Sequence, residues 1–190
     1  MIRINVKAKE KNDLGNLIRL AFQNTFLQNE VVCEKCNKKS EVSEKSYHIK
    51  KLPPYLLISM NLIYYDNFNA EPKKIIEIVN PLIEMDIVKI FKEIKSEKNP
   101  EIFGEYNLYS IIIHKGATPN SGHYYSLGRN LNSDDRNWYI FNDSEIVKLS
   151  KNLNLKDILQ EKETPIIFFF ENTKKIGIEP LDGRTIRIDN

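Results

Sequence analysis

The stretch "YNLYSIIIHKGATPNSGHYYSLGRN", residues 106–130, contains two strand-like runs that flank a polar loop at 116–121. The Ile run in the first predicts a strand buried on both faces. The second begins at His123, one of only three histidines in the chain, and Gly122 precedes it. A glycine at such a junction lets another backbone or a substrate approach closely. A lone histidine is more often structural than chemical, so its neighbours decide its meaning.

The second strand continues through the loop "NLNSDD" at 130–135 into the strand-like run "NWYIFND" at 137–143. If these two strands form a hairpin, the end of one returns beside the start of the other, which puts Asn142 or Asp143 next to His123. We expect the Asn142 side chain within about 2.6–3.2 Å of a His123 ring nitrogen. Asp143 should then face the opposite side. A histidine oriented by Asn or Asp is the base of many cysteine and serine hydrolases, although Asn-Asp is also ordinary turn chemistry.

The remaining segments predict one early helix followed by a mainly antiparallel sheet, an α+β fold. Asp13 is a candidate N-cap for a helix over 13–28, whose apolar stripe is Leu14, Leu17, Ile18, Phe22 and Phe26. Further strands are expected at 2–6, 55–60, 145–149 and 165–172, with a short helix at 156–162. Residues 78–91 suggest a strand followed by a loop, which the pattern alone does not settle, and residues 90–105 are expected to form a charged loop.

The composition limits the classes of function. The chain has 190 residues, 41% hydrophobic and 28% charged, with a net charge of +2. Lysines alternate with acidic residues instead of forming a basic stripe, which argues against nucleic acid as a partner. The sequence has no run long and apolar enough for a signal peptide or a membrane span. The only two cysteines lie close together and form no disulfide framework, which suits the cytoplasm or nucleus.

Several motifs together resemble the ubiquitin-specific proteases, which are papain-like cysteine peptidases. "YNLYSIIIHKGATPNSGHYYSLGRN" resembles the histidine box of that family, and "NWYIFNDSEIVKLS" at 137–150 resembles the box that follows it. The segments 33–66, 80–90 and 165–172 resemble the finger with its central strand, a Phe-Pro-containing segment and the closing strand. The resemblance covers residues 2–172 and leaves a polar tail at 173–190. It implies the sheet of the palm and part of the fingers, without the helical lobe that carries the cysteine.

The resemblance implies a role for each matching residue. His123 would be the general base, Asn142 the third member of the triad, and Asp143 an auxiliary polar group beside it. The loop 116–121 would border the channel for the ubiquitin C-terminal tail, and Gly122 and Tyr124 would line that channel. Ubiquitin and ubiquitinated proteins would be the partners, and the reaction would cleave the bond after the last ubiquitin glycine.

The nucleophile is the main departure from the family pattern. The family has a Gly-Asn-Thr-Cys type of box far upstream of the histidine, whereas "LGNLIRLAFQNTFLQN" at 14–29 has Gly15-Asn16 and no cysteine. We therefore expect this chain alone to be inactive and to need a separate N-terminal half that carries the cysteine. The alternative is a non-catalytic ubiquitin-binding or scaffold module. A zinc-ribbon nucleic-acid binder is a third reading, with one CxxC in its favour and no basic stripe.

Cys33 and Cys36 match the finger and form half of a zinc site. Structural zinc takes four ligands, so zinc requires a second CxxC supplied upstream, and no other cofactor is needed. His48 is a conceivable third ligand but should face a neighbouring strand, and His114 should be a packed, hydrogen-bonded residue. A sheet without its helical lobe should also leave an apolar patch exposed beside His123, which would make the isolated chain marginally stable and prone to aggregate.

Overall fold

The computed structural model describes residues 1–6, 13–27, 31–40, 43–45, 52–65, 71–90 and 104–174. The helices are α1 (Leu14–Phe22) and α3 (Leu155–Ile158), with a further helical turn at 87–90. The strands of the main sheet are β1 (Ile2–Asn5), β6 (Tyr55–Asn61), β9 (Glu84–Asp86), β10 (Glu105–Thr118), β11 (Ser121–Gly128), β12 (Tyr139–Asn142), β13 (Glu145–Lys148) and β14 (Glu163–Asn172). The short strands are β2 (Thr25–Leu27), β3 (Val31–Val32), β4 (Lys39–Ser40), β5 (Ser43–Lys45), β7 (Ile63–Tyr65) and β8 (Pro72–Lys74).

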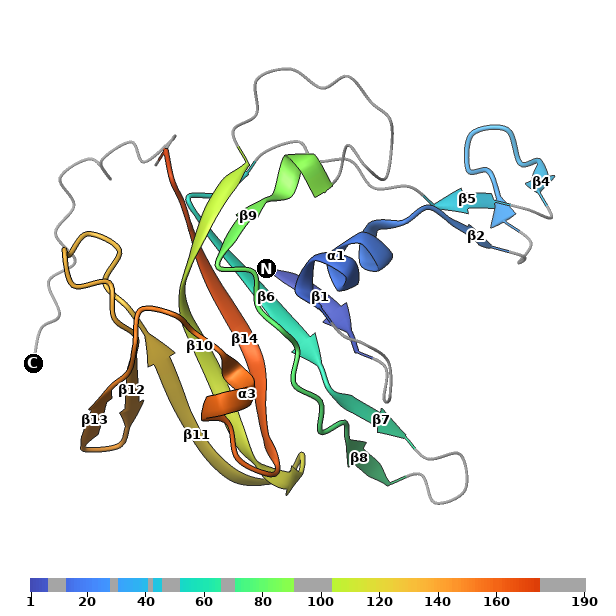
Figure 1. The fold of residues 1–190 in the computed structure, drawn as a ribbon. Helices are drawn as coiled ribbons and strands as arrows, with labels where there is room; N and C mark the ends of the chain where they lie inside the picture. The colour runs from blue at the N-terminus through green and yellow to red at the C-terminus, as the bar shows by residue number, and fades with distance from the viewer. Residues whose placement is uncertain are drawn as a thin grey trace, which may run out of the picture.

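One twisted sheet organises the molecule, in the strand order β1-β6-β14-β10-β11-β12-β13, with β9 paired to the start of β10 (Figure 1). The predicted meander is present, because β10, β11, β12 and β13 pair with their sequence neighbours antiparallel. The last strand, β14, does not extend the meander. It returns to pair with β10 and β6, while β1 joins β6 as the one parallel pair in this sheet.

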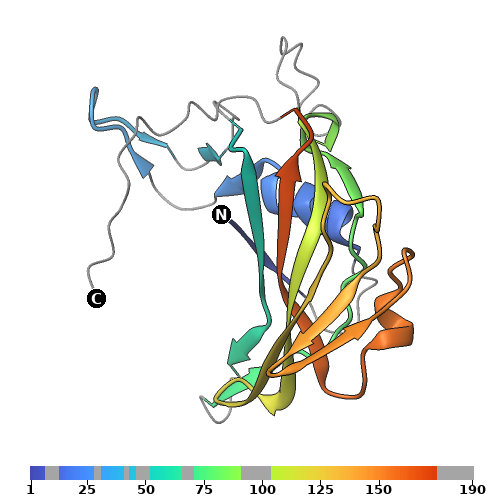
Figure 2. The ribbon, with the colours of Figure 1, turned by 90° about the vertical axis from the view of Figure 1, so that its left-hand side faces the viewer.

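The core lies on one face of this sheet, the face that carries both helices (Figures 1 and 2). Leu14, Leu17 and Ile18 of α1 pack there, as the helical stripe predicted, and Asp13 caps the helix by accepting from the Asn16 N–H at 2.9 Å. Burial of these apolar side chains is the main stabilising contribution. The strands supply alternate residues to the same cluster, among them Ile4, Ile58, Leu108, Ile111, Leu127, Phe168 and Phe170.

The opposite face is only partly covered, which corrects the expectation for residues 106–114. Along β10 the inward residues Tyr106, Leu108, Ile111 and Ile113 are fully buried, whereas Ile112 is half-buried. A bulge between Leu108 and Ser110 shifts the alternation by one residue. Phe169 on β14 is half-buried on this outer face as well. The Ile run therefore reflects one buried face and one apolar, half-exposed face.

The early helix is shorter than predicted. It ends at Phe22, the backbone of Gln23 is extended, and residues 25–27 form β2. Phe26 is therefore 70% exposed on a strand and does not continue the helical stripe. Asn24 and Thr25 are weak helix formers, which explains the early stop. The ambiguous segment 78–91 forms β9 and the helical turn, and residues 91–103 lie outside the described part of the chain.

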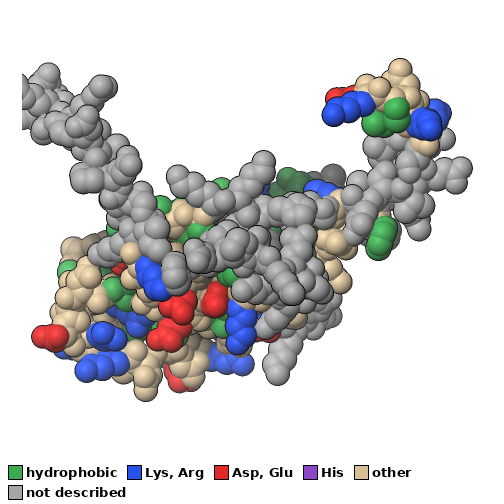
Figure 3. All heavy atoms as spheres, turned by 90° about the horizontal axis from the view of Figure 1, so that it is seen from above, with side chains coloured by type: hydrophobic (Ala, Val, Ile, Leu, Met, Phe, Trp, Pro, Cys, Tyr) green, Lys and Arg blue, Asp and Glu red, His purple; other side chains and the backbone are tan. Residues whose placement is uncertain are grey.

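The strand pairs β2–β5 and β3–β4 form an arm that projects away from the main sheet (Figures 1 and 2). The face seen in Figure 3 carries Lys and Arg side chains interspersed with Asp and Glu among its described residues. This mixture matches the charge pattern of the sequence and forms no basic stripe there. In the described part of the chain, none of the helices combines the length and the apolar character needed to cross a bilayer.

Candidate active site

His123 lies on β11, on the helix-bearing face of the sheet. Its i+4 neighbour Leu127 is fully buried in the core, and alternate strand residues share a face. The strands continue further than the sequence suggested: β10 runs to Thr118 and pairs with Ser121, so Pro119 and Asn120 alone form the turn. The loop expected at 116–121 is therefore mostly strand, with a register shift between Lys115 and Thr118 that absorbs the polar, glycine-containing sequence.

Gly122 is the position where this hairpin needs a glycine. Its φ is +153°, a backbone conformation that side-chain-bearing residues rarely adopt. A Cβ placed there would lie 2.4 Å from both the His114 Nε2 atom and the Lys115 carbonyl oxygen. The missing side chain thus permits the close crossing of β10 and β11 immediately before His123.

Asn142, at the end of β12, meets His123 as the hairpin geometry predicts. The His123 Nε2 atom lies 2.6 Å from the Asn142 Oδ1 atom, which is within the expected hydrogen-bond reach. Leu127 pairs with Ile140, so Asn142, two residues further on, lies on the same face as His123. An amide oxygen accepts only, so Nε2 carries the proton in neutral His123. The Nδ1 lone pair is then free to accept a proton.

Asp143 also lies beside His123, and the expectation that it faces the opposite side is wrong. Its Oδ2 atom is 3.6 Å from His123 Nε2. Alternation fails because Asp143 belongs to the turn between β12 and β13 and has a φ of 51°. The carboxylate is 79% exposed, so water screens its interaction with the imidazole strongly.

A buried carboxylate lies behind His123, and the sequence reasoning missed it. Glu163, at the start of β14, is 5% exposed and lies 3.2 Å from the Lys115 Nζ atom. Its Oε2 atom accepts from the Tyr125 hydroxyl at 2.9 Å and from the Gln160 N–H at 2.8 Å. Burial alone would raise the pKa of Glu163, but these hydrogen bonds and Lys115 outweigh it and hold that pKa below its ordinary value. The sequence offered one hint of this carboxylate. Tyr125, two residues after His123, lies on the same face of the strand, and its hydroxyl needs an acceptor when buried.

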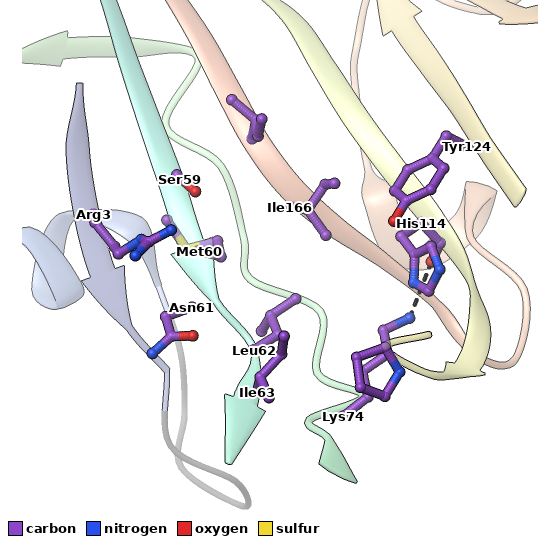
Figure 4. A pocket seen from close by; sticks show the side chains of 12 residues that line it. Arg3, Ser59, Met60, Asn61, Leu62, Ile63, Lys74, His114, Tyr124 and Ile166 are labelled. Carbon is purple, nitrogen blue, oxygen red and sulfur yellow. Dashed lines mark hydrogen bonds between the residues drawn. The ribbon is translucent and has the colours of Figure 1, made fainter. Parts of the chain in front are cut away.

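On the opposite face of β11, Tyr124 borders a cavity of about 220 Å³. Figure 4 shows Tyr124 and His114 together at one side of this cavity, with Arg3, Ser59 and Asn61 across from them. The Tyr124 and His114 rings lie 4.7 Å apart, and Tyr124 is 57% exposed. His123 and Tyr124 therefore lie on opposite faces of β11. The two faces meet at the end of the hairpin, where Gly122 lies.

Lys74 of β8 lines this cavity and forms hydrogen bonds to the end of the β10–β11 hairpin. Its Nζ atom donates to the carbonyl oxygens of His114 at 3.2 Å, Gly116 at 2.8 Å and Lys162 at 3.3 Å. The dashed line in Figure 4 marks the bond from Lys74 to the His114 carbonyl oxygen. The partial burial of the ammonium lowers the pKa of Lys74. One side chain thereby joins β8, the end of β10 and the turn before β14.

His114 is packed, as expected, but only partly hydrogen-bonded. It is 4% exposed, it makes a backbone hydrogen bond to Ser121, and its Nε2 atom finds no hydrogen-bond partner among the residues that the structure describes. Burial lowers the pKa of His114, and the nearby Lys74 charge lowers it further. The fold thus favours the neutral form of this imidazole.

Cys33 and Cys36 lie in the turn between β3 and β4 on the projecting arm, and both are exposed free thiols. The Cys33 carbonyl accepts from Asn37 N–H at 2.8 Å, and backbone hydrogen bonds from Cys36 and Lys35 lower the pKa of Cys33. Thiols in such a turn suit zinc, but no cluster of three or more potential ligands occurs among the described residues. His48 lies outside those residues. The arm also separates both thiols from β11 (Figure 1).

Comparison with known proteins agrees with this geometry. A family model described as ubiquitin carboxyl-terminal hydrolase matches residues 3–170. The chain therefore belongs to the ubiquitin carboxyl-terminal hydrolase family, in the ubiquitin-specific protease branch of cysteine peptidases. The resemblance inferred from the histidine box is thereby confirmed at the level of the family.

The relatives are longer than this chain. Ubiquitin carboxyl-terminal hydrolase 25 of Arabidopsis thaliana is 29% identical over 98% of the chain and 25% of its own length. Ubiquitin carboxyl-terminal hydrolase 9 of Saccharomyces cerevisiae is 24% identical over 90% of the chain and 22% of its own length. The chain thus spans about a quarter of these curated relatives.

Solved structures confirm the fold. The chain is similar to a structure of the SAGA DUB module, a complex of Ubp8, Sgf11, Sus1 and Sgf73 bound to monoubiquitin, with a TM-score of 0.67 and 24% identity. The match covers 90% of this chain and 34% of the other. A second structure of that module, bound to ubiquitin aldehyde, gives a TM-score of 0.65. The sheet-dominated, papain-like architecture with few helices is therefore the catalytic-domain fold of ubiquitin-specific proteases.

Proposed function

We propose that this chain supplies the base and its orienting residue to a deubiquitinating cysteine protease. The observation that carries the proposal is the 2.6 Å contact between His123 Nε2 and Asn142 Oδ1, at the strand positions that match the family's histidine box. That contact fixes one tautomer and leaves Nδ1 as the basic atom. Asp143, whose Oδ2 atom lies 3.6 Å from the same ring nitrogen, is an exposed auxiliary polar group beside this pair.

In the proposed reaction a cysteine thiol gives its proton to Nδ1 of His123, and the thiolate attacks the carbonyl carbon of the last ubiquitin glycine. The imidazolium then protonates the departing amine, which leaves a thioester on the cysteine. His123 next takes a proton from water, the hydroxide attacks the thioester, and the thiol is regenerated. Cys33 and Cys36 lie on the projecting arm and match the finger, so the nucleophile would come from a separate N-terminal half.

Gly122 and Tyr124 are proposed to contact the ubiquitin tail. Tyr124 is exposed beside the 220 Å³ cavity, on the opposite face of β11 from His123. A tail that reaches both residues must pass the end of the β10–β11 hairpin, where Gly122 lies. Ubiquitin and ubiquitinated proteins are accordingly the proposed partners, and the relevant domain is residues 1–172, followed by a polar tail.

A non-catalytic ubiquitin-binding or scaffold module is the second candidate. It is favoured by the lack of a third cysteine in the sequence. The two thiols on the arm would bind zinc only together with two further ligands, and that zinc would be structural in either case. A binding module does not need an oriented imidazole, so the His123–Asn142 contact favours the enzyme over the binding module.

The test joins the chain to a Cys-bearing N-terminal segment taken from a longer relative. We expect the isolated chain to be inert toward a fluorogenic ubiquitin C-terminal amide and toward a ubiquitin electrophile. The joined protein should hydrolyse the amide and label at the added cysteine. His123→Ala should lower hydrolysis by about 10²–10⁴-fold, because general acid–base catalysis contributes a factor of this size.

The control is Asp143→Ala, which should lose far less activity than His123→Ala because the Asp143 carboxylate is exposed and screened. Equal activity of the joined protein and its His123→Ala variant would refute the base assignment. Labelling of the isolated chain at Cys33 or Cys36 would refute the assignment of the nucleophile. Tight binding of ubiquitin without hydrolysis in the joined protein would favour the binding module.

A further inference from the structure

A row of charged groups crosses the sheet beside His123. Lys115 on β10 is the direct pairing partner of His123 on one side and of Glu163 on the other. Directly paired residues in an antiparallel sheet have Cβ atoms about 5 Å apart, so the Lys115 side chain can reach either neighbour. The order across the strands is carboxylate, ammonium, imidazole, and then Asp143 at the end of β12.

The Lys115 ammonium lies on the Glu163 side of this row, away from His123. The Lys115 Nζ atom lies 3.2 Å from Glu163 Oε1 and 3.3 Å from Gln160 Oε1, both on the β14 side of the row. The Glu163 side chain is 6% exposed, whereas that of Lys115 is 50% exposed. A carboxylate so deeply buried needs compensating charge and donors, and Lys115 is its ion-pair partner.

The position of the Lys115 ammonium matters because of the other groups that face His123. The cleft in front of the imidazole is lined by Lys115, Tyr125, Asn142, Glu145, Gln160 and Glu163, and Asp143 lies at its edge. Lys115 is the one cation in this set. Its pairing partner on the other side is His123, so an ammonium not held by Glu163 is within reach of the imidazole.

We propose that Glu163 is a positioning residue for His123 that acts through Lys115, because it keeps the ammonium of Lys115 from opposing the imidazolium that the reaction needs. The inference rests on the proposed function of His123. It assigns the Glu163 carboxylate a role besides its hydrogen bonds to Tyr125 and Gln160. Those two bonds hold the carboxylate in place, and the ion pair with Lys115 transmits its effect to the active site.

The test is the titration of the His123 imidazole, followed by NMR on the full chain and assigned with His123→Ala. Glu163→Gln should move the titration midpoint to lower pH by about half a unit to one unit, since Lys115 is then unpaired beside the imidazole. Lys115→Met should move it to higher pH. The Glu163→Gln/Lys115→Met double variant should return close to the wild-type midpoint.

Glu161→Gln is the matched control, because Glu161 is exposed two residues away and its loss should leave the midpoint unchanged. Equal shifts in Glu163→Gln and in the double variant would show a purely structural role and overturn the proposal. If Glu163→Gln fails to fold, Lys115→Met decides: an upward shift supports the proposal, and an unchanged midpoint overturns it.

The titration needs no nucleophile, so it separates this inference from the proposed function. If the midpoints shift as predicted but the joined protein is inactive, Glu163 still influences the His123 imidazole, but this influence has no catalytic role. In an active joined protein, the acid limb of the pH profile of kcat/KM, where His123 becomes protonated, should move to lower pH in Glu163→Gln and recover in the double variant.

Discussion

At the scale of single residues, Gly122 is the position where a small change should have the largest effect. Ala at this position would place a Cβ 2.4 Å from two neighbouring atoms at a φ of +153°. We expect Gly122→Ala to lower the free energy of unfolding by about 1–3 kcal/mol, the usual cost of a strained backbone position. Urea denaturation measures the loss.

Gly128→Ala is the comparison for this prediction. The nearest atom to a Cβ at Gly128 is a ring carbon of Phe141 at 3.2 Å, and this glycine has no positive φ. Phe141 is exposed and can move, so the loss should be smaller than for Gly122→Ala. A larger loss at Gly128 would contradict the reading of Gly122 as the constrained crossing of the hairpin.

His114 makes the stability of the fold depend on pH. Burial holds its pKa below the ordinary value near 6.5, so the unfolded chain binds a proton more readily than the folded one. Stability from this group is therefore fully present above pH 6.5 and is lost as the pH falls through the folded pKa. We expect a smaller decrease between pH 7.5 and 5.5 in His114→Phe than in the wild type, measured by chemical denaturation. An equal decrease in both would rule out His114 as the source.

At the scale of secondary-structure elements, Lys74 should act as a clamp on the hairpin end. Lys74→Met removes the donor that serves three carbonyl oxygens. We expect a loss of about 1–3 kcal/mol, typical of removing the charged partner of partly buried acceptors. Thermal or urea unfolding checks this value. Lys151→Met, a change of the same kind at an exposed site, should stay within about 0.5 kcal/mol.

The strands were predictable because their patterns are local. The apolar alternation and short loops of residues 106–148 are sufficient to predict the meander β10–β13, and the meander alone brings Asn142 to His123. The partner of β14 was not predictable, because a strand such as "PIIFFFEN" fits any apolar sheet edge and tertiary packing decides its neighbour. For the same reason Glu163 was missed, since its proximity to Lys115 and Tyr125 depends on that pairing. Asp143 was misplaced because a turn residue escapes the alternation rule.

At the scale of the whole molecule, β12 and β13 expose apolar side chains on both faces of the sheet. Val147 lines the cleft that contains His123, whereas Phe141 and Ile146 lie on the opposite face, so the patch is not confined to the side of His123, contrary to the expectation. Ile146 is 65% exposed and Val147 48% exposed on β13, and Phe141 is 43% exposed on β12. In the main sheet β13 is an edge strand, and apolar edge strands promote association between chains. The half-buried Phe169 and Ile112 extend the apolar character over the outer face.

We therefore expect the isolated chain to bind a hydrophobic dye and to self-associate with rising concentration. Ile146→Lys places a charge on the edge strand and should reduce both signals without lowering stability by more than about 0.5 kcal/mol, because the site is exposed. Light scattering and dye fluorescence measure the outcome. A wild-type chain that stays monomeric and binds no dye would instead indicate a self-sufficient module.

The central claim is that Asn142 holds His123 in the tautomer that leaves Nδ1 basic, and one measurement tests it most directly. Long-range ¹H–¹⁵N NMR correlations of the imidazole report which nitrogen carries the proton. We expect neutral His123 to be protonated at Nε2 in the folded chain, and Asn142→Ala to shift it toward a mixture of tautomers. Protonation at Nδ1 in the wild type, or identical spectra in the wild type and Asn142→Ala, would contradict the account.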